Sequence, residues 1–175
     1  YNTTGNRNTF TGVDCGRNNT TGNDNSFYGF LSGYINTSGQ YNTFFGNESG
    51  YNNTTGNDNS FYGFKSGNKN TNGGNNTFIG NKSGHDNLIG SYNTFLGNYS
   101  GYNNIIGNSN TFSGYYSGYT NRGNNNTFMG YQAGKLTLTG NDNISIGKDA
   151  GLSNSTGSNN CFIGNLAGSN HLGGS

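Results

Sequence analysis

The sequence contains no proline, two cysteines and few charged residues, and it has no long hydrophobic run. Flexible linkers commonly contain proline, and disordered chains are usually rich in charge and poor in aromatic residues. Here 9% of the residues are charged and 14% are aromatic. These proportions argue against a disordered linker, although the 33 glycines and the 27% hydrophobic content would by themselves favour one.

The same scarcities argue against several classes of function. The net charge is +1 without a basic run or patch, so the electrostatic footprint of a nucleic-acid-binding protein is missing. No apolar stretch approaches the roughly 20 residues of a membrane span, so we expect none. Cys15 and Cys161 are too few for a disulfide framework.

What the sequence does contain is a repeat of 17 residues, with the consensus N-T-F-x-G-x-x-S-G-x-x-N-T-T-G-N-D. We number its positions one to seventeen. The spacing between units is 17 throughout, except for one step of 16 between Asn110 and Asn126. Position one is asparagine in every unit: Asn8, Asn25, Asn42, Asn59, Asn76, Asn93, Asn110, Asn126, Asn143 and Asn160.

Glycine stands at positions five, nine and fifteen of every unit, and the short unit keeps Gly123 while lacking a residue just before it. Three glycines per unit would each cost about 1 kcal/mol inside a helix. The unit is also shorter than helical repeats, which need roughly 33 to 47 residues, and propeller blades, which need about 40 or more. The repeat therefore predicts an all-β protein, a β-solenoid (parallel β-roll) of about ten 17-residue coils. Glycine is expected to supply the positive φ angles of its turns.

Phenylalanine fills position three in nine of the ten units. Stacked coils would place these rings about 4.8 Å apart in one aromatic ladder. The exception is Ser145, where we expect the coil to be repacked. The predicted core ladder is Phe10, Phe27, Phe44, Phe61, Phe78, Phe95, Phe112, Phe128 and Phe162.

Asparagine ladders are expected to join the coils as well. Position one is always asparagine and position twelve is mostly asparagine, as at Asn19 and Asn36. Stacked asparagines can satisfy one another's amides along a fibre axis and can cap backbone groups of the turns, so we predict asparagine ladders at both positions.

Position four carries a mostly apolar column next to the phenylalanines. Successive residues of a strand point to opposite faces, so this column should face outward if position three faces the core. A continuous apolar stripe marks an interface, from which we infer association of the rod with copies of itself. The candidate interface is Tyr28, Phe45, Tyr62, Ile79, Leu96, Met129, Ile146 and Ile163.

The unit resembles a repeat of bacterial and phage surface proteins of the tail-fibre type, most plainly in NTFIGNKSG (76–84) and NCFIGNLAG (160–168). It is also similar in style to the head β-rolls of trimeric autotransporter adhesins, whose coils are nearer fourteen residues. The resemblance implies an extracellular or virion-surface fibre or stalk, often trimeric. We expect residues 1–175 to form a single repeat domain and to be a segment of a longer fibre protein, since neither end shows an obvious polar cap.

Residues suited to catalysis or metal binding are sparse and scattered. His85 and His171 lie five units apart, and we expect both to be solvated surface residues. Calcium-binding β-rolls place an aspartate in each coil, whereas most coils here lack an acidic residue at positions seven and seventeen, where most of the acidic residues occur, so we expect turn-capping aspartates. We therefore predict no enzymatic activity, cofactor or metal.

Three functions remain open at this point. The first is a structural building block of an extracellular fibre, filament or stalk. The second is an adhesin or tail-fibre shaft that binds glycans through a tyrosine-rich face, with Tyr34, Tyr51, Tyr102 and Tyr119 at position ten. The third is an ice-binding β-roll, suggested by the threonines at position two but weakened by Ser26, Ser60, Ile144 and Cys161 in that column. Sequons such as those at Asn19, Asn53, Asn98 and Asn154 leave glycosylation open.

Overall fold

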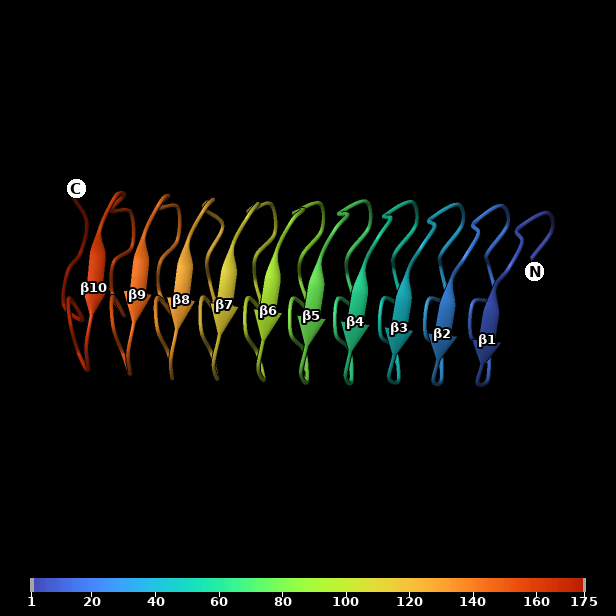
Figure 1. The fold of residues 1–175 in the computed structure, drawn as a ribbon, viewed down its shortest axis with the longest axis horizontal. Coiled ribbons are helices and arrows are strands. Elements are labelled where there is room, and N and C mark those ends of the chain that lie inside the picture. The colour runs from blue at the N-terminus through green and yellow to red at the C-terminus, as the bar shows by residue number, and fades with distance from the viewer. Residues whose placement is uncertain (1, 175) are drawn as a thin grey trace.

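The computed structural model describes residues 2–174, which form one straight solenoid with the two ends of the chain at opposite ends of the rod (Figure 1). Each unit contributes one three-residue strand from positions two to four. Within residues 2–174 the strands are β1 (Thr9–Thr11), β2 (Ser26–Tyr28), β3 (Thr43–Phe45), β4 (Ser60–Tyr62), β5 (Thr77–Ile79), β6 (Thr94–Leu96), β7 (Thr111–Ser113), β8 (Thr127–Met129), β9 (Ile144–Ile146) and β10 (Cys161–Ile163).

The strands form one parallel sheet in sequence order, so each coil pairs only with the coils before and after it. The register matches equal repeat positions, as in Phe27 opposite Phe44. It is kept across the 16-residue step, where Phe112 lies opposite Phe128. The remainder of each coil consists of turns, and residues 2–174 contain no helix. The predicted β-solenoid is thus confirmed, and no helix long and apolar enough to cross a membrane occurs in this range.

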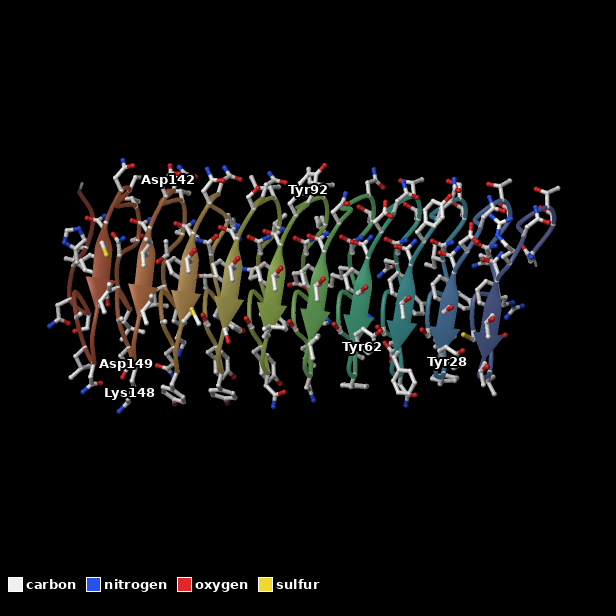
Figure 2. The ribbon with its side chains drawn as sticks, in the orientation of Figure 1. Tyr28, Tyr62, Tyr92, Asp142, Lys148 and Asp149 are labelled. Carbon is white, nitrogen blue, oxygen red and sulfur yellow. The ribbon has the colours of Figure 1, made fainter. Side chains whose placement is uncertain are left out.

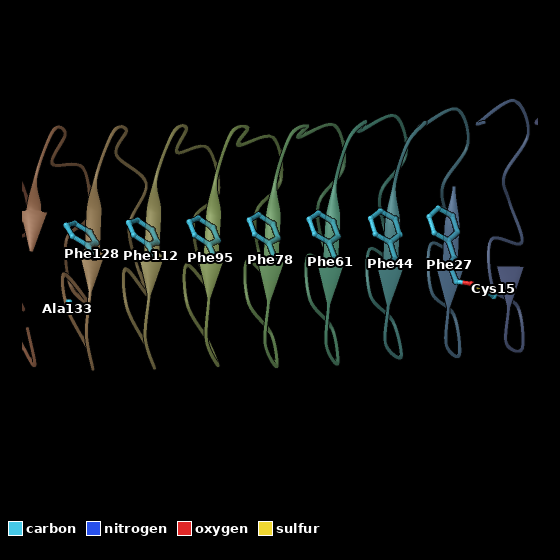
Figure 3. Close-up of a cluster of buried hydrophobic side chains, with 9 residues drawn as sticks. All are labelled: Cys15, Phe27, Phe44, Phe61, Phe78, Phe95, Phe112, Phe128 and Ala133. Atoms are coloured by element: carbon cyan, nitrogen blue, oxygen red, sulfur yellow. Dashed lines mark hydrogen bonds between the residues drawn. The ribbon is translucent and has the colours of Figure 1, made fainter. Parts of the chain in front are cut away.

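A single column of phenylalanine rings runs along the inside of the rod (Figure 3). From Phe10 to Phe128 successive rings stack with centroids 4.6 to 5.0 Å apart, which agrees with the spacing expected for stacked strands. The seven rings from Phe27 to Phe128 have no exposed surface. In so thin a coil, one phenylalanine per turn supplies most of the apolar core.

The phenylalanine column stops after Phe128. Ser145 takes the next place and is buried, while Phe162 in the last coil is only partly buried. A Cβ atom built on Gly151 would lie 3.0 Å from the ring of Phe162, so this ring borders the space beside Ser145. Phe162 also packs at a tilt of 55° against His171. Phe162 therefore does not extend the predicted continuous ladder.

The three glycine columns serve different purposes. Gly63 at position five has a φ of 132°, and Gly67 at position nine has a φ of 58°, so both have the expected positive φ. Gly39 at position fifteen is not among the positive-φ glycines. A Cβ atom there would instead lie 2.5 Å from the carbonyl oxygen of Gly56 in the next coil. The expectation that all three columns supply positive φ was wrong for position fifteen, where glycine allows two backbones to approach.

Positive φ also occurs at two positions that carry side chains. Position seven has φ near 55°, as in Leu31 and Lys65, and position seventeen is similar, as in Tyr41. Such conformations cost L-residues roughly 1–2 kcal/mol each. The N–H of Leu31 donates to Val13 O and that of Tyr41 to Asn23 O, both in the preceding coil. These inter-coil hydrogen bonds help to hold the left-handed conformation, which the variable residue types at both positions did not signal.

Candidate interaction surfaces

Buried asparagines join neighbouring coils through two different networks. At position twelve each Nδ2 donates to the Oδ1 of the asparagine one coil earlier, at 2.7 to 2.9 Å, from Asn19 to Asn104. The same Nδ2 also donates to the glycine carbonyl three residues later, as from Asn53 to Gly56. Position twelve therefore forms the amide-to-amide ladder that the sequence predicted.

Position one forms a side-chain-to-backbone ladder instead. The Oδ1 of Asn25 accepts from the backbone N–H of Asn42 at 3.0 Å, and the Nδ2 of Asn42 donates to Gly56 O at 2.8 Å. This pattern continues along the rod to Asn160. The predicted capping of backbone groups is thus confirmed at position one, whereas amide-to-amide bonds occur there only near the C-terminal end, where Asn143 and Asn160 donate to the preceding Oδ1. Position one directly precedes the strand, and its Oδ1 therefore lies closer to the backbone N–H of the asparagine in the next coil than to the side-chain amide of that asparagine.

The amide ladder of position twelve is interrupted at the 16-residue unit. Among the described side chains, Asn104 Oδ1, both amide atoms of Asn121 and the Oγ1 of Thr137 are buried without a hydrogen-bond partner. The unit is one residue short between Asn121 and Gly123, and the next unit carries Thr137 in place of asparagine. A buried polar atom without a partner costs about 1–3 kcal/mol, so this junction is a local weak point of the rod.

The outer face of the sheet carries the apolar column of position four. Its side chains point away from the core, with Phe45 56% exposed, Ile79 44% and Ile163 67%, whereas Tyr28 is half-buried. Tyr28 and Tyr62 lie along one edge of the rod, which Lys148 and Asp149 also line (Figure 2). Position two shares this face with a row of threonine and serine, such as Thr43 and Ser60. The face thus pairs a hydroxyl row with an apolar row.

Tyrosines form short stacks on other parts of the surface. Tyr34 stacks on Tyr51 with ring centroids 5.2 Å apart, and Tyr102 stacks on Tyr119 at 5.1 Å. Burial raises the pKa of Tyr102. Because each stacked ring covers the face of its neighbour, these tyrosines present their edges and hydroxyls to solvent.

His85 continues this column in a coil that has no tyrosine there. Its ring stacks on Tyr102 at 4.9 Å, and its Nδ1 lies 2.5 Å from a carboxylate oxygen of Asp86. His85 is 9% exposed, so the expectation of a solvated histidine was wrong. Burial lowers its pKa, and the hydrogen bond with Asp86 opposes this shift. Stacking on Tyr102 in the next coil covers one face of the His85 ring and contributes to its burial.

The other candidate reactive residues lie apart from one another. Cys15 and Cys161 are both unpaired, and burial raises the pKa of Cys15 to about 11. Arg7 forms an ion pair with Asp24 at 2.5 Å, which joins two exposed turns. Within residues 2–174 there is no group of three or more metal-ligating side chains and no detectable pocket.

The sequons differ in accessibility. Asn19, Asn53 and Asn154 belong to the buried position-twelve column, whereas Asn98 at position six is exposed. A glycan requires an exposed amide, so the folded rod offers Asn98 and not the other three.

Comparisons of this chain with protein-family models, with curated proteins and with solved structures gave no match.

Proposed function

We propose that this chain is a structural building block of an extracellular fibre, filament or stalk, and that rods associate through the apolar column of position four. The observation that carries the proposal is the combination of two features in one repeat. Buried ladders bond neighbouring coils, and eight of the ten coils carry an aromatic or aliphatic side chain at position four that points outward in the same direction.

The buried ladders favour a load-bearing role. A coil contacts only its neighbours, so the stability of a solenoid grows with the interfaces between adjacent repeats. The interfaces from the first coil to the eighth contain stacked phenylalanine rings, such as Phe44 on Phe61 at 4.9 Å. They also contain asparagine hydrogen bonds, such as Asn53 to Asn36 at 2.9 Å. Ten coils at about 4.8 Å each form a rod roughly 48 Å long.

The exposed column favours association. Large apolar stripes on soluble proteins commonly mark protein–protein contacts. Phe45, Ile79 and Met129 are each more than 40% exposed, and they recur along one face of a straight rod. Contacts of this kind are additive along the rod, so weak contacts per coil can hold two rods together.

The test is sedimentation and electron microscopy of the 175-residue chain beside two charged variants. Ile79→Glu with Met129→Glu places charge in the column, whereas Thr55→Glu with Thr139→Glu places the same charge at exposed sites in the turns. We expect the parent and the turn variant to form assemblies and the column variant to remain single rods. A parent chain that stays a single rod at high concentration would overturn the proposal.

Glycan binding through the tyrosine-rich face is less well supported. Sugars stack on the faces of aromatic rings, and in the pairs Tyr34–Tyr51 and Tyr102–Tyr119 the facing sides of both rings are already stacked. Binding of oligosaccharides on an array that is lost in a Tyr102→Ala, Tyr119→Ala double variant would favour this alternative over a purely structural role.

One observation favours ice binding as an alternative function. The threonines of position two lie on the flat outer face of the sheet, next to the apolar column. Measurement of thermal hysteresis tests this alternative directly, with Thr77→Lys and Thr94→Lys as the variants that should abolish it.

A further inference from the structure

The position-four column is not uniform along the rod. Its N-terminal part is aromatic, with Tyr28, Phe45 and Tyr62, and its C-terminal part is aliphatic, with Met129, Ile146 and Ile163. Between Leu96 and Met129 the column is interrupted by Ser113, which leaves one small residue in an otherwise bulky row. The distribution of side-chain size along the column therefore has a direction.

Two straight rods packed face to face keep a constant separation, about 10 Å between sheets. Protein interiors are close-packed, so each layer between the rods must be filled to a similar volume. Parallel rods would be related by a two-fold axis along the rod, which reverses the strand direction across the interface. The two position-four columns would then meet only if this axis ran between them, and each residue of the column would face its own copy. Tyr62 would then meet Tyr62 in an overfilled layer, and Ser113 would meet Ser113 in an underfilled one.

We infer that two copies of this chain pair antiparallel through the outer sheet face, with coil four (59–75) of each opposite coil seven (110–125) of the other. This inference rests on the proposed self-association and specifies its geometry. The two-fold axis runs along the strand direction and passes between Ile79 and Leu96.

In this arrangement large residues face smaller ones. Tyr62 lies over Ser113 and fills the gap in the column. The remaining pairs of position four are Ile79 with Leu96, Phe45 with Met129, Tyr28 with Ile146 and Thr11 with Ile163. Methionine sulfur makes favourable contacts with aromatic rings, which suits the pairing of Phe45 with Met129.

Position six, just beyond the column, supports the same register. Phe64 and Tyr115 are 43% and 42% exposed, and coil four opposite coil seven brings these two rings together. Phe30 is 48% exposed and would face Lys148, whose side chain is 64% exposed. Aromatic pairs and cation–π pairs are both favourable contacts.

The size of the face is compatible with a weak, reversible pair. Ten strands at about 4.8 Å and three residues at about 3.3 Å give a face of roughly 48 by 10 Å. The side chains that protrude from the face and the rings of position six make its solvent-accessible area larger than this projected area. The projected area, about 480 Å² per rod, is below the roughly 800 Å² that a standard specific interface buries on each partner, so we expect a weak pair that depends on concentration.

Pulsed electron–electron double resonance measures distances between spin labels, and on singly labelled chains it tests whether the two rods run antiparallel. The labels go to position fourteen, outside the strands, at Thr21→Cys, Thr55→Cys or Ile106→Cys, in a background with Cys15→Ser and Cys161→Thr. In the antiparallel pair the axial offset between the two labels is about 43, 24 and 5 Å respectively, at 4.8 Å per coil.

The possible outcomes separate this inference from the proposed function. Distances that shorten from Thr21 to Thr55 to Ile106 support the antiparallel pair. Equal distances at the three sites in an associated sample mean parallel rods and overturn the inference, while the proposed self-association stands. A sample without intermolecular distances, monomeric by sedimentation, overturns both.

A size swap tests the register. We expect Ser113→Tyr and Tyr62→Ser each to raise the dissociation constant of the pair about tenfold or more, because one overfills and the other empties the same layer. The combined variant should return to within about threefold of the parent. Both residues lie on the outer face, and circular dichroism checks that each variant folds. Losses that simply add in the combined variant would overturn this register.

Discussion

At the scale of single residues, glycine is required for two different reasons. At position five the backbone adopts a φ of about 130°, which side chains disfavour, as in Gly63. At position fifteen the φ is not unusual, but the next coil passes too close for a Cβ atom, as at Gly39. Substitution at position fifteen therefore tests coil-to-coil distance without a change in backbone preference.

We predict that Gly39→Ala lowers the free energy of unfolding by about 2 kcal/mol or more. Its Cβ would lie 2.5 Å from Gly56 O, and the backbone cannot yield without separating two coils. Gly74→Ala is the matched control, because its Cβ would lie 3.1 Å from Asn57 O and its φ is not positive. Denaturant unfolding measures both variants. Equal losses for the two would contradict the explanation from close approach.

His85 gives the rod a specific dependence on pH. Burial lowers its folded pKa below the ordinary value of 6.5, so the unfolded chain takes up the proton first as pH falls. The stability that neutral His85 contributes is present above pH 6.5 and is lost as pH falls through the folded pKa. Asp86, Lys69 and Lys82 are the charged groups that act on this ring.

We predict that His85→Tyr reduces the loss of thermal stability between pH 7 and pH 5. Tyrosine does not titrate in this range, and it is the residue at the same position in the next coil, Tyr102. Melting temperatures of both proteins across the range provide the measurement. The same slope in the variant as in the parent would show that other groups cause the pH dependence.

At the scale of the strand, alternation decides which aromatic residues stabilise the fold. Phe44 and Phe45 are adjacent in β3, yet Phe44 is fully buried and Phe45 is 56% exposed. The ring of Phe44 stacks on both Phe27 and Phe61, whereas Phe45 has looser contacts with Tyr28 and Tyr62 at 5.7 and 6.4 Å. Identical side chains on one strand therefore have different roles.

We predict that Phe44→Ala costs about 3–5 kcal/mol of stability, as for other buried aromatic residues. Phe45→Ala should cost less than about 1 kcal/mol in the single rod and should instead weaken association. Chemical unfolding at low concentration and sedimentation at high concentration separate the two effects. A larger stability loss for Phe45→Ala than for Phe44→Ala would refute this assignment of faces.

At the scale of the whole molecule, the ladders do not run the full length of the rod. The amide ladder of position twelve stops at Asn104, and the phenylalanine stack stops at Phe128. Neighbouring repeats stabilise one another in a solenoid, so an interrupted interface lets the coils beyond it open more easily. The C-terminal coils should therefore exchange their amide hydrogens first.

We predict that inserting one threonine between Arg122 and Gly123 stabilises the rod by about 1–3 kcal/mol, since it restores the 17-residue unit around the unpaired amides of Asn121. Hydrogen exchange should then slow in coils seven and eight.

The control is the same insertion between Thr55 and Gly56, in a complete unit whose Asn53 amide is fully bonded. This insertion should destabilise the rod. A destabilising effect of the insertion at Gly123 would show that the short unit is already the better fit.

The sequence by itself determined the period, the β-solenoid, the buried phenylalanine column and the outward column beside it. These follow from residue spacing, from the length of a unit and from the alternation of side chains in a strand, all of which are local rules. Only the tertiary structure decided that Asn42 bonds backbone while Asn53 bonds another amide, that Gly39 is needed for space, and that the amide ladder stops at Asn104. Each of these depends on contacts between residues about 17 apart in the chain, and such contacts depend on the path of the coil, which a repeat pattern does not specify.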